Sequence, residues 1–310
     1  GGSWICDWHD RMKSHAARFG MTLRPTLPIA ERRWHDGQVL RTESPVAPDK
    51  LSAHLAGLKA VQEDSLAMLG GSGRWQTGNP WAAMSFADYM VAKGLPETVQ
   101  REFIAWWTIS GSGDITKVNV LDALHSASKC GGTMEAMLEE LSDTIEGGVG
   151  TLAERMIMGS GAEVILGDAV VEVTDKGDHA ALRLSSGQTV LAGQVVLAVP
   201  VNAVGTIRFD PTLRPAQARL ARDKHRGRAI KMLLQVKGVR PGVLVTGDAE
   251  GLRLMFAERS LSDGSTLIIG FGLYDEVPDT SFVAMQRAVA QFFPEATLLA
   301  HDWHDWIRDP

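Results

Sequence analysis

The 310-residue sequence has little cysteine and no long apolar run. Its two cysteines, Cys6 and Cys130, cannot form a disulfide framework, so we expect a reducing compartment, the cytoplasm. No run of 18 or more apolar residues exists, which excludes a transmembrane helix, and no signal-peptide pattern opens the chain. The sequence therefore predicts a soluble protein.

An excess of positive charge is also absent. The chain has 31 Lys and Arg against 37 Asp and Glu, a formal net charge of −6. Such a balance gives no electrostatic footprint for nucleic acid or an anionic membrane, and neither is expected as a partner. What is present is ordinary globular composition, 45% hydrophobic and 22% charged, with enough chain for one large domain or two intertwined ones.

The periodicity of the apolar residues changes along the chain. A short helix is predicted over 10–19, and a helical block over 49–142, including a helix over 134–141. Helices are also predicted over 151–158, 214–224 and 281–293. Strands are predicted over 163–166, 170–174, 180–184, 195–199, 229–237, 252–257, 265–272 and 297–306. Helices clustered between groups of strands indicate a mixed α/β (α+β) protein with two sheets and a helical block.

A glycine-rich loop, Gly147 to Ala153, contains the pattern G-x-G-x-x-A, and Asp168 lies twenty residues beyond Gly148. In a dinucleotide-binding unit such glycines let the backbone approach a pyrophosphate at a helix N-terminus. That function requires a buried strand directly before the loop, and only 143–146 is left for one. A simple entry loop to a helix is therefore the better interpretation.

Metal binding and nucleophilic hydrolysis have little local support. His301 and His304 could share a metal ion on a helix, but the predicted strand would point them to opposite faces. No third ligand is near, and no metal is expected. There is no G-x-S-x-G motif, and neither cysteine has a local cue for a thiolate.

Lys231 is unusual because it interrupts the apolar run Ala229–Leu234 of a predicted strand. An unpaired ammonium is costly to bury, so this lysine must either extend to solvent or reach a polar cavity. From the strand pattern alone, extension to solvent is favoured. The alternative is a desolvated lysine of lowered pKa that holds a water in an active site.

Short motifs over nearly the whole chain occur in the order found in flavin-dependent amine oxidases. Each is weak alone, and their common order and spacing make the signal. They are 1–4 (GGSW), 17–21 (ARFGM), 78–81 (GNPW), 128–132 (SKCGG), 147–152 (GGVGTL), 195–200 (VVLAVP), 207–211 (IRFDP), 213–215 (LRP), 227–231 (GRAIK) and 306–310 (WIRDP). The chain thus resembles the monoamine oxidase superfamily of flavin-containing amine oxidases.

The resemblance implies a flavoprotein with FAD as cofactor. The four N-terminal residues would lie against the flavin ring system, a tryptophan near the end would flank the isoalloxazine, and a strand residue would hold the adenine through its backbone. The residues implied to contact FAD are Gly1, Gly2, Ser3, Trp4, Val170 and Trp306.

The resemblance also assigns the reacting centre. Lys231 would hold a water at flavin N5, which replaces the favoured extension to solvent, and Ile109 and Ser110 would line the substrate cavity. The implied reaction is oxidation of an unprotonated amine by hydride transfer to the flavin. The imine then hydrolyses to an aldehyde plus ammonia or an amine, and dioxygen is reduced to hydrogen peroxide. The partners would be a small-molecule amine and dioxygen, and a homodimer is left open.

The family's N-terminal dinucleotide-binding unit and its C-terminal flavin-binding segment are not found in this sequence. The chain is accordingly expected to be a fragment that does not hold FAD tightly by itself. The resemblance divides it between an FAD domain and a substrate domain. The FAD domain would comprise 1–23 and 146–220, and the substrate domain 24–145 and 221–310.

Two other classes of function stay open. One is another flavin enzyme of the same fold, either a desaturase or an L-amino-acid oxidase. Desaturases commonly lack the lysine that corresponds to Lys231. An amino-acid oxidase needs an arginine for the substrate carboxylate, and the sequence does not identify one. The other is a non-catalytic, degenerate or truncated relative that serves as a binding module.

Overall fold

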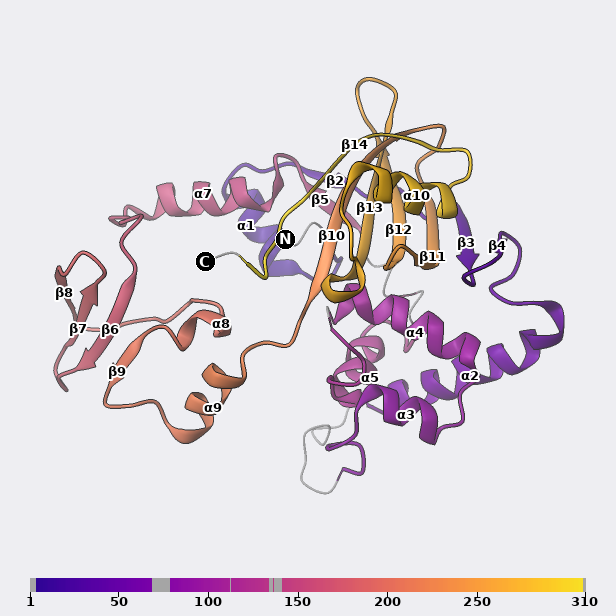
Figure 1. Ribbon diagram of the computed structural model, residues 1–310. Helices are drawn as coiled ribbons and strands as arrows, with labels where there is room; N and C mark the ends of the chain where they lie inside the picture. The colour runs from indigo at the N-terminus through magenta and orange to yellow at the C-terminus, as the bar shows by residue number, and fades with distance from the viewer. Residues whose placement is uncertain (1–3, 69–78, 112, 134–135, 137–140, 309–310) are drawn as a thin grey trace. The chain divides into compact units, whose positions relative to one another are not determined.

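The computed structural model describes residues 4–68, 79–111, 113–133, 136 and 141–308 (Figure 1). Its contacts divide the chain into two compact units. The first contains Gly1–Leu152 and Gly227–Pro310, and the second contains Ala153–Arg226. The division into FAD and substrate domains concerns function, and it stays a prediction.

A seven-stranded mixed sheet is the centre of the first unit. Only β3 and β11 pair in parallel; the other neighbouring strands are antiparallel. The order across the sheet is β14 (Thr297–Trp303), β10 (Ala229–Lys237), β13 (Thr266–Leu273), β12 (Leu252–Ser260), β11 (Val243–Ala249), β3 (Glu31–His35) and β4 (Leu40–Arg41).

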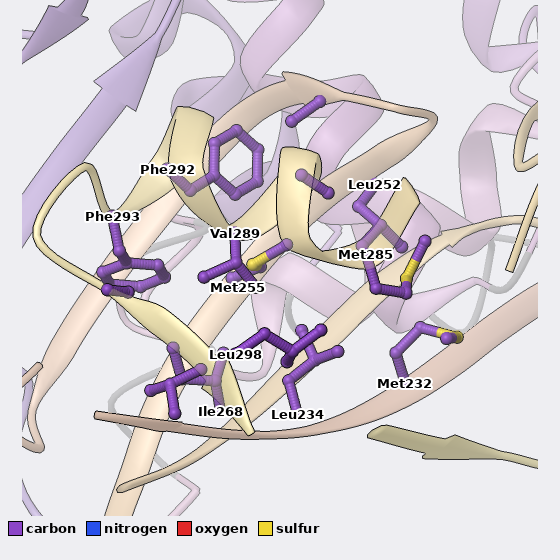
Figure 2. Packing of buried hydrophobic residues seen from close by; sticks show 14 of the residues in the cluster. Met232, Leu234, Leu252, Met255, Ile268, Met285, Val289, Phe292, Phe293 and Leu298 are labelled. Carbon is purple, nitrogen blue, oxygen red and sulfur yellow. The ribbon is translucent and has the colours of Figure 1, made fainter. Parts of the chain in front are cut away.

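One face of this sheet packs against α10 (Phe282–Phe292), which begins at Ser281, whose hydroxyl accepts the Ala284 backbone N–H. The side chains between sheet and helix are apolar and fully buried, and they come from alternate positions of the strands. Figure 2 shows this core, with Met285, Val289 and Phe292 of the helix against the strand residues Met232, Leu234, Met255 and Ile268. Burial of this surface stabilises the arrangement of sheet and helix.

The other face of the sheet carries α4 (Glu97–Ser110), which contacts β11, β12 and β13. Helix α4 also belongs to a helical group with its own aromatic core, in which Phe86, Phe103 and Trp106 meet edge to face. The other helices of the group are α2 (Pro48–Ala67), α3 (Phe86–Ala92) and α5 (Val120–Ser128). Among the described residues, no helix is long and apolar enough to cross a membrane.

A three-stranded antiparallel sheet completes the first unit, with β5 (Asp143–Ile145) between β1 (Trp4–Ile5) and β2 (Leu23–Pro25). Its small core joins Ile5 and Ile145 to α1 (Asp10–Arg18) and to Leu152 in α7 (Gly148–Ser160). This sheet places Trp4, the first described residue, in a regular strand.

The second unit contains a four-stranded sheet, in which β6 and β9 pair in parallel. Two short helices, α8 (Val201–Val204) and α9 (Pro215–Asp223), flank β9 in sequence. The strand order is β8 (Thr189–Ala192), β7 (Ala180–Leu184), β6 (Val170–Asp175) and β9 (Arg208–Asp210).

The predicted mixed α and β class is confirmed, and strand 229–237 has the predicted bounds. Two strand predictions, 163–166 and 195–199, are wrong: neither segment pairs with a strand among the described residues, and both expose apolar side chains. Apolar sequence is not enough for a strand, because the backbone groups also need a ladder partner. Most of the helix predicted over 134–141 lies outside the described residues.

Candidate functional site

Lys231 lies on the α4 face of the large sheet. Along β10, Ile230, Met232 and Leu234 are buried in the α10 core, so Lys231 and Leu233 point to the opposite face. The register of β10 and β13 places Lys231 directly across from Phe271. Strand alternation thus brings the only charged residue of 229–234 beside an aromatic ring.

Two aromatic rings surround the lysine ammonium. Lys231 Nζ lies 5.0 Å from the centre of the Trp4 ring and 5.7 Å from that of Phe271. The two rings are themselves 6.2 Å apart at an interplanar angle of 36°. A cation near aromatic faces is attracted by the ring quadrupole, which offsets part of its lost hydration.

Burial lowers the pKa of Lys231, because the ammonium loses more solvation than the neutral amine. The carboxylate of Glu258 acts in the opposite direction by stabilising the charge, and the net pKa lies below the ordinary lysine value of 10.5. Glu258 is itself buried on β12 and ion-pairs with Arg259. The environment therefore makes Lys231 a weaker base than a surface lysine.

An apolar cavity of about 380 Å³ adjoins the Trp4 and Phe271 rings. We call it the aromatic cavity. Two of its polar atoms, Trp4 Nε1 and Thr26 Oγ1, are buried and have no hydrogen-bond partner among the described residues. The lining residues are Trp4, Thr26, Leu27, Pro28, Ile29, Ile109, Leu141, Ser142, Leu244, Leu254, Phe256 and Phe271.

Of the residues predicted to contact substrate, the structure brings one to this cavity. Ile109, in the last turn of α4, lines it, whereas Ser110 at the end of the same helix is exposed and does not. Trp4, predicted to lie against the flavin, lines the cavity as well. Their roles in binding stay predictions.

Of the other residues predicted to contact FAD, the two that the structure describes, Val170 and Trp306, are not among the residues that line the aromatic cavity. Val170 begins β6 in the second unit. Trp306 follows β14, is 61% exposed, and packs edge-on against His304 without lining the aromatic cavity. Gly1, Gly2 and Ser3 lie outside the described residues.

Several cavity residues were not identified from the sequence. Leu254, Phe256 and Phe271 occupy alternate positions of predicted strands, which suggests a shared face but does not say what that face meets. Leu244 belongs to β11, a strand that was not predicted, although Val243–Val245 is an apolar run with two β-branched valines.

The glycine-rich loop joins a short antiparallel strand, β5, to the start of helix α7. Strand β5 precedes it, but β5 has three residues and antiparallel neighbours, unlike the parallel strand of a dinucleotide-binding unit. Gly147 and Gly148 have φ of 80° and 85°, and the Thr151 hydroxyl donates to the Gly147 carbonyl at 2.8 Å. The positive φ values explain the glycines without a ligand.

His301 lies in β14, where its Nε2 is 2.8 Å from the Thr280 carbonyl oxygen. The imidazole therefore links β14 to the segment before α10. Within the described part of the chain, no three His, Cys, Asp or Glu residues are grouped as metal ligands would be.

The family model described as "Flavin containing amine oxidoreductase" matches residues 1–308. Among similar proteins, (S)-6-hydroxynicotine oxidase of Paenarthrobacter nicotinovorans is 24% identical over 224 residues, which are 72% of this chain and 52% of that protein. Nicotine dehydrogenase of Pseudomonas putida is 25% identical over 230 residues, 73% of this chain and 48% of that protein. The chain thus spans about half the length of these two curated relatives.

The fold is also found among solved structures. Putrescine oxidase with putrescine bound superimposes with a TM-score of 0.84 at 16% identity, covering all of this chain and 74% of that one. At this identity the likeness establishes a common fold.

Proposed function

The chain belongs to the family of flavin-containing amine oxidoreductases, and from that membership we propose that it serves the FAD-dependent oxidation of a small, largely apolar amine. The amine loses two electrons and two protons to become an imine, which water hydrolyses to an aldehyde and ammonia or a smaller amine. Bound FAD would supply the electron acceptor and pass both electrons to dioxygen, giving hydrogen peroxide.

The observation that carries the proposal is the position of Lys231. It is a partly buried ammonium at 5.0 Å and 5.7 Å from the rings of Trp4 and Phe271, both of which line the aromatic cavity. Lys231 does not itself line this cavity, but a polar group beside the rings that line it can hold a water near the reacting atoms while solvent is excluded elsewhere. The lowered pKa of Lys231 also eases movement of a proton at Nζ.

The aromatic cavity itself favours the reactive form of the substrate. Its walls are mostly aliphatic and aromatic, with Leu244, Ile109 and Phe256 among them. Transfer into such surroundings disfavours an ammonium ion relative to the neutral amine. Only the neutral amine has the nitrogen lone pair that assists oxidation at the neighbouring carbon, so selection of this form aids the chemistry.

The residues around Lys231 fit a flavin. The isoalloxazine is flat, with hydrogen-bond acceptors along its edge, and the site offers aromatic faces and the unpartnered Nε1–H donor of Trp4. Trp4 and Lys231 would therefore hold this part of the cofactor. Val170 and Trp306 remain proposed contacts, to the adenine and the isoalloxazine.

One similar protein gives reason to consider a second electron acceptor. The Pseudomonas putida relative is named a dehydrogenase, while the Paenarthrobacter relative is named an oxidase. The alternative is thus that the electrons pass to an acceptor other than dioxygen. Formation of peroxide would indicate dioxygen as the acceptor, whereas reduction of an artificial dye without peroxide would indicate another acceptor.

The test uses the protein as its gene encodes it, with any coding sequence that flanks these 310 residues. We expect the visible bands of a bound flavin, bleached without oxygen by at least one of a panel of alkyl and cyclic amines, including putrescine, cyclohexylamine and nicotine. Admission of oxygen should restore the bands with one peroxide per amine. Lys231→Met should keep the flavin and slow reoxidation.

The matched control is Lys237→Met, an exposed lysine at the end of the same strand, which should leave reoxidation unchanged. Absence of flavin bands after addition of FAD, or bands that no amine bleaches, would overturn the proposal. Equal reoxidation in Lys231→Met and wild type would remove the role of the lysine.

A further inference from the structure

Two apolar segments of the second unit, 163–166 and 195–199, pair with no strand among the described residues. The first connects α7 to β6, and the second connects β8 to α8 (Figure 1). We call them the unpaired segments. Leu166 and Val196 are 86% and 89% exposed. The large apolar side chains that the two segments expose are Val164, Ile165, Leu166, Val195, Val196, Leu197 and Val199.

This exposure is concentrated in one part of the molecule. Half of the exposed large apolar side chains in the described part of the chain lie in Ala153–Arg226, which has about a quarter of the residues. Single exposed apolar residues are normal on a protein surface, whereas contiguous ones mark a surface that another segment or partner covers. The unpaired segments are contiguous apolar runs of this second kind.

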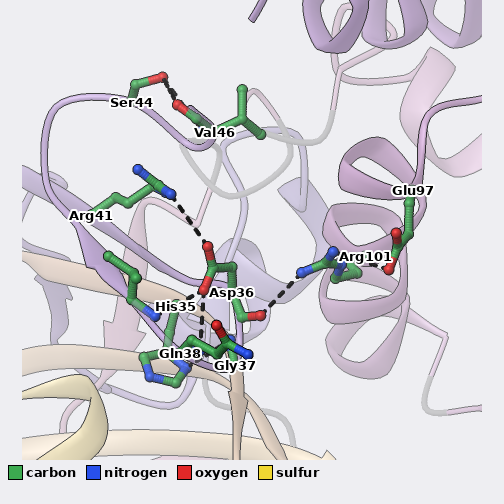
Figure 3. A network of polar contacts seen from close by, with 10 residues as sticks. His35, Asp36, Gly37, Gln38, Arg41, Ser44, Val46, Glu97 and Arg101 are labelled. Atoms are coloured by element: carbon green, nitrogen blue, oxygen red, sulfur yellow. Dashed lines mark hydrogen bonds and ion pairs between the residues drawn. The ribbon is translucent and has the colours of Figure 1, made fainter. Parts of the chain in front are cut away.

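The backbone of the unpaired segments is also without partners. Backbone groups outside helices and strands can be satisfied by nearby side chains, as in the turn after β3 (Figure 3). There the Asp36 carboxylate accepts the Gln38 backbone N–H at 3.1 Å, and the Asp36 carbonyl accepts Arg101 at 3.1 Å. In the unpaired segments, no backbone N–H or carbonyl forms a hydrogen bond with another described residue. An extended segment in this state can accept a neighbouring strand.

The residue pattern indicates which kind of sheet would receive these segments. Apolar residues occupy consecutive positions in both, as Val-Val-Leu-Ala-Val over 195–199 and Val-Ile-Leu over 164–166. A half-buried strand alternates apolar and polar residues, whereas a strand that is covered on both faces is apolar throughout. The valines and the isoleucine also favour extended backbone. Each segment is therefore suited to a strand whose two faces are both covered.

Similar proteins are long enough to supply such a cover. The putrescine oxidase chain superimposes on all of this chain, and about a quarter of that chain lies outside the match. The matches to the two curated relatives leave about half of each relative outside. A polypeptide of that length contains enough additional chain for strands and for the elements that cover them.

We propose that a further segment of the same polypeptide, outside these 310 residues, supplies strands that pair with the unpaired segments and elements that cover their side chains. Pairing satisfies the free backbone N–H and carbonyl groups, and the cover buries the exposed apolar surface. The second unit thereby gains the core that its own residues do not provide. The proposal concerns the assembly of this unit and does not rest on the proposed oxidation.

The test uses the protein as its gene encodes it and compares the same substitution at two exposed valines. Val196 lies in an unpaired segment, and Val91, in α3, is 72% exposed and serves as the matched control. Under a cover, Val196→Asp places a carboxylate without a partner among apolar groups. We expect it to lower Tm by about 5 °C or more, and Val91→Asp to change Tm by less than about 2 °C.

Hydrogen exchange of the wild-type protein gives a second measurement, which decides the matter should Val196→Asp fail to fold. We expect amides of 164–166 and 195–199 to exchange at least about a hundredfold more slowly than in an unstructured peptide. Exchange at the unstructured rate, equal Tm shifts for the two variants, or a gene product without a further segment would overturn the proposal. Protection that disappears when dilution converts a dimer to monomers would also overturn it, because a second copy would then be the cover.

Discussion

At the scale of single residues, the protein places an ionisable group where solvation is poor. Lys231 shares its sheet face with Phe271 and contacts Trp4, whereas its neighbours Ile230 and Met232 are buried in the α10 core. Contact with ring faces recovers part of the hydration energy that burial removes. The remainder is expressed as a lowered pKa.

This residue gives a prediction for stability against pH. Since the native state releases the Lys231 proton at a lower pH than the unfolded state, wild type gains stability relative to Lys231→Met as pH rises from the lowered pKa to 10.5. Urea unfolding at several pH values measures this difference, with Lys237→Met as the control for loss of an exposed charge. A difference between wild type and Lys231→Met that is constant or falls over this range would contradict the prediction.

At the scale of elements, the turn between β11 and β12 depends on one glycine. Ala249 pairs with Leu252, so the loop has two residues, Glu250 and Gly251, with φ of 52° and 84°. Positive φ at both positions is the type I′ pattern, which matches the twist of hairpin strands. A Cβ on Gly251 would lie 2.0 Å from the Glu276 carbonyl oxygen. The position therefore requires glycine for a second reason, because any larger residue would clash with this backbone oxygen.

Gly251→Ala should therefore lower the free energy of unfolding by more than about 2 kcal/mol, because strain and a clash with backbone act together. Gly264→Ala is the matched control: its φ is 80°, but its Cβ would meet nothing within 4 Å. We expect it to cost about 1 kcal/mol from backbone strain alone. Equal losses for the two variants, measured by denaturant unfolding, would show that the clash relaxes.

Helix α10 provides a second test at this scale. Phe292 is fully buried between helix and sheet (Figure 2), so Phe292→Ala should cost about 3–5 kcal/mol through lost transfer energy and a cavity. Phe282, at the start of the same helix, is 45% exposed, and Phe282→Ala should cost less than about 1 kcal/mol. If Phe292→Ala lowered the free energy of unfolding only slightly, the neighbouring side chains would have to move in and fill the space left by the ring.

At the scale of the whole molecule, the two compact units differ in how much core they contain. The first unit has four clusters of buried apolar side chains. In the second, Ala153–Arg226, only Leu184 and Ala221 are buried apolar residues. Burial of apolar surface is the main favourable term in folding. The four-stranded sheet of the second unit is therefore stabilised by less buried apolar surface than the sheets of the first unit, and it should open locally more easily.

Hydrogen exchange should report this contrast directly. Amides of β6 and β7 should exchange faster than amides of β10 and β13 under native conditions, because local opening of the smaller sheet exposes little apolar surface. Mass spectrometry of proteolytic peptides resolves the four strands. Equal protection of the two sheets would contradict the prediction.

The candidate site was only partly accessible to sequence reasoning. Strand 229–237 and the position of Lys231 in it were predictable, because alternation is a local property. That Lys231 meets Phe271, forty residues away, depends on strand register, and that both meet Trp4 depends on a second sheet.

The sequence by itself determined the mixed α and β class, most helices, the strands β6, β7, β10, β12, β13 and β14, and the motifs by which the chain resembles its family. These follow from periodicity and from residue order, which neighbouring residues carry without reference to the rest of the fold. Only the tertiary structure decided which rings surround Lys231, that Ile109 rather than Ser110 lines the aromatic cavity, and that 163–166 and 195–199 are not strands. The physical reason is that burial, ring contacts and strand pairing each require a partner distant in sequence, and folding alone selects that partner.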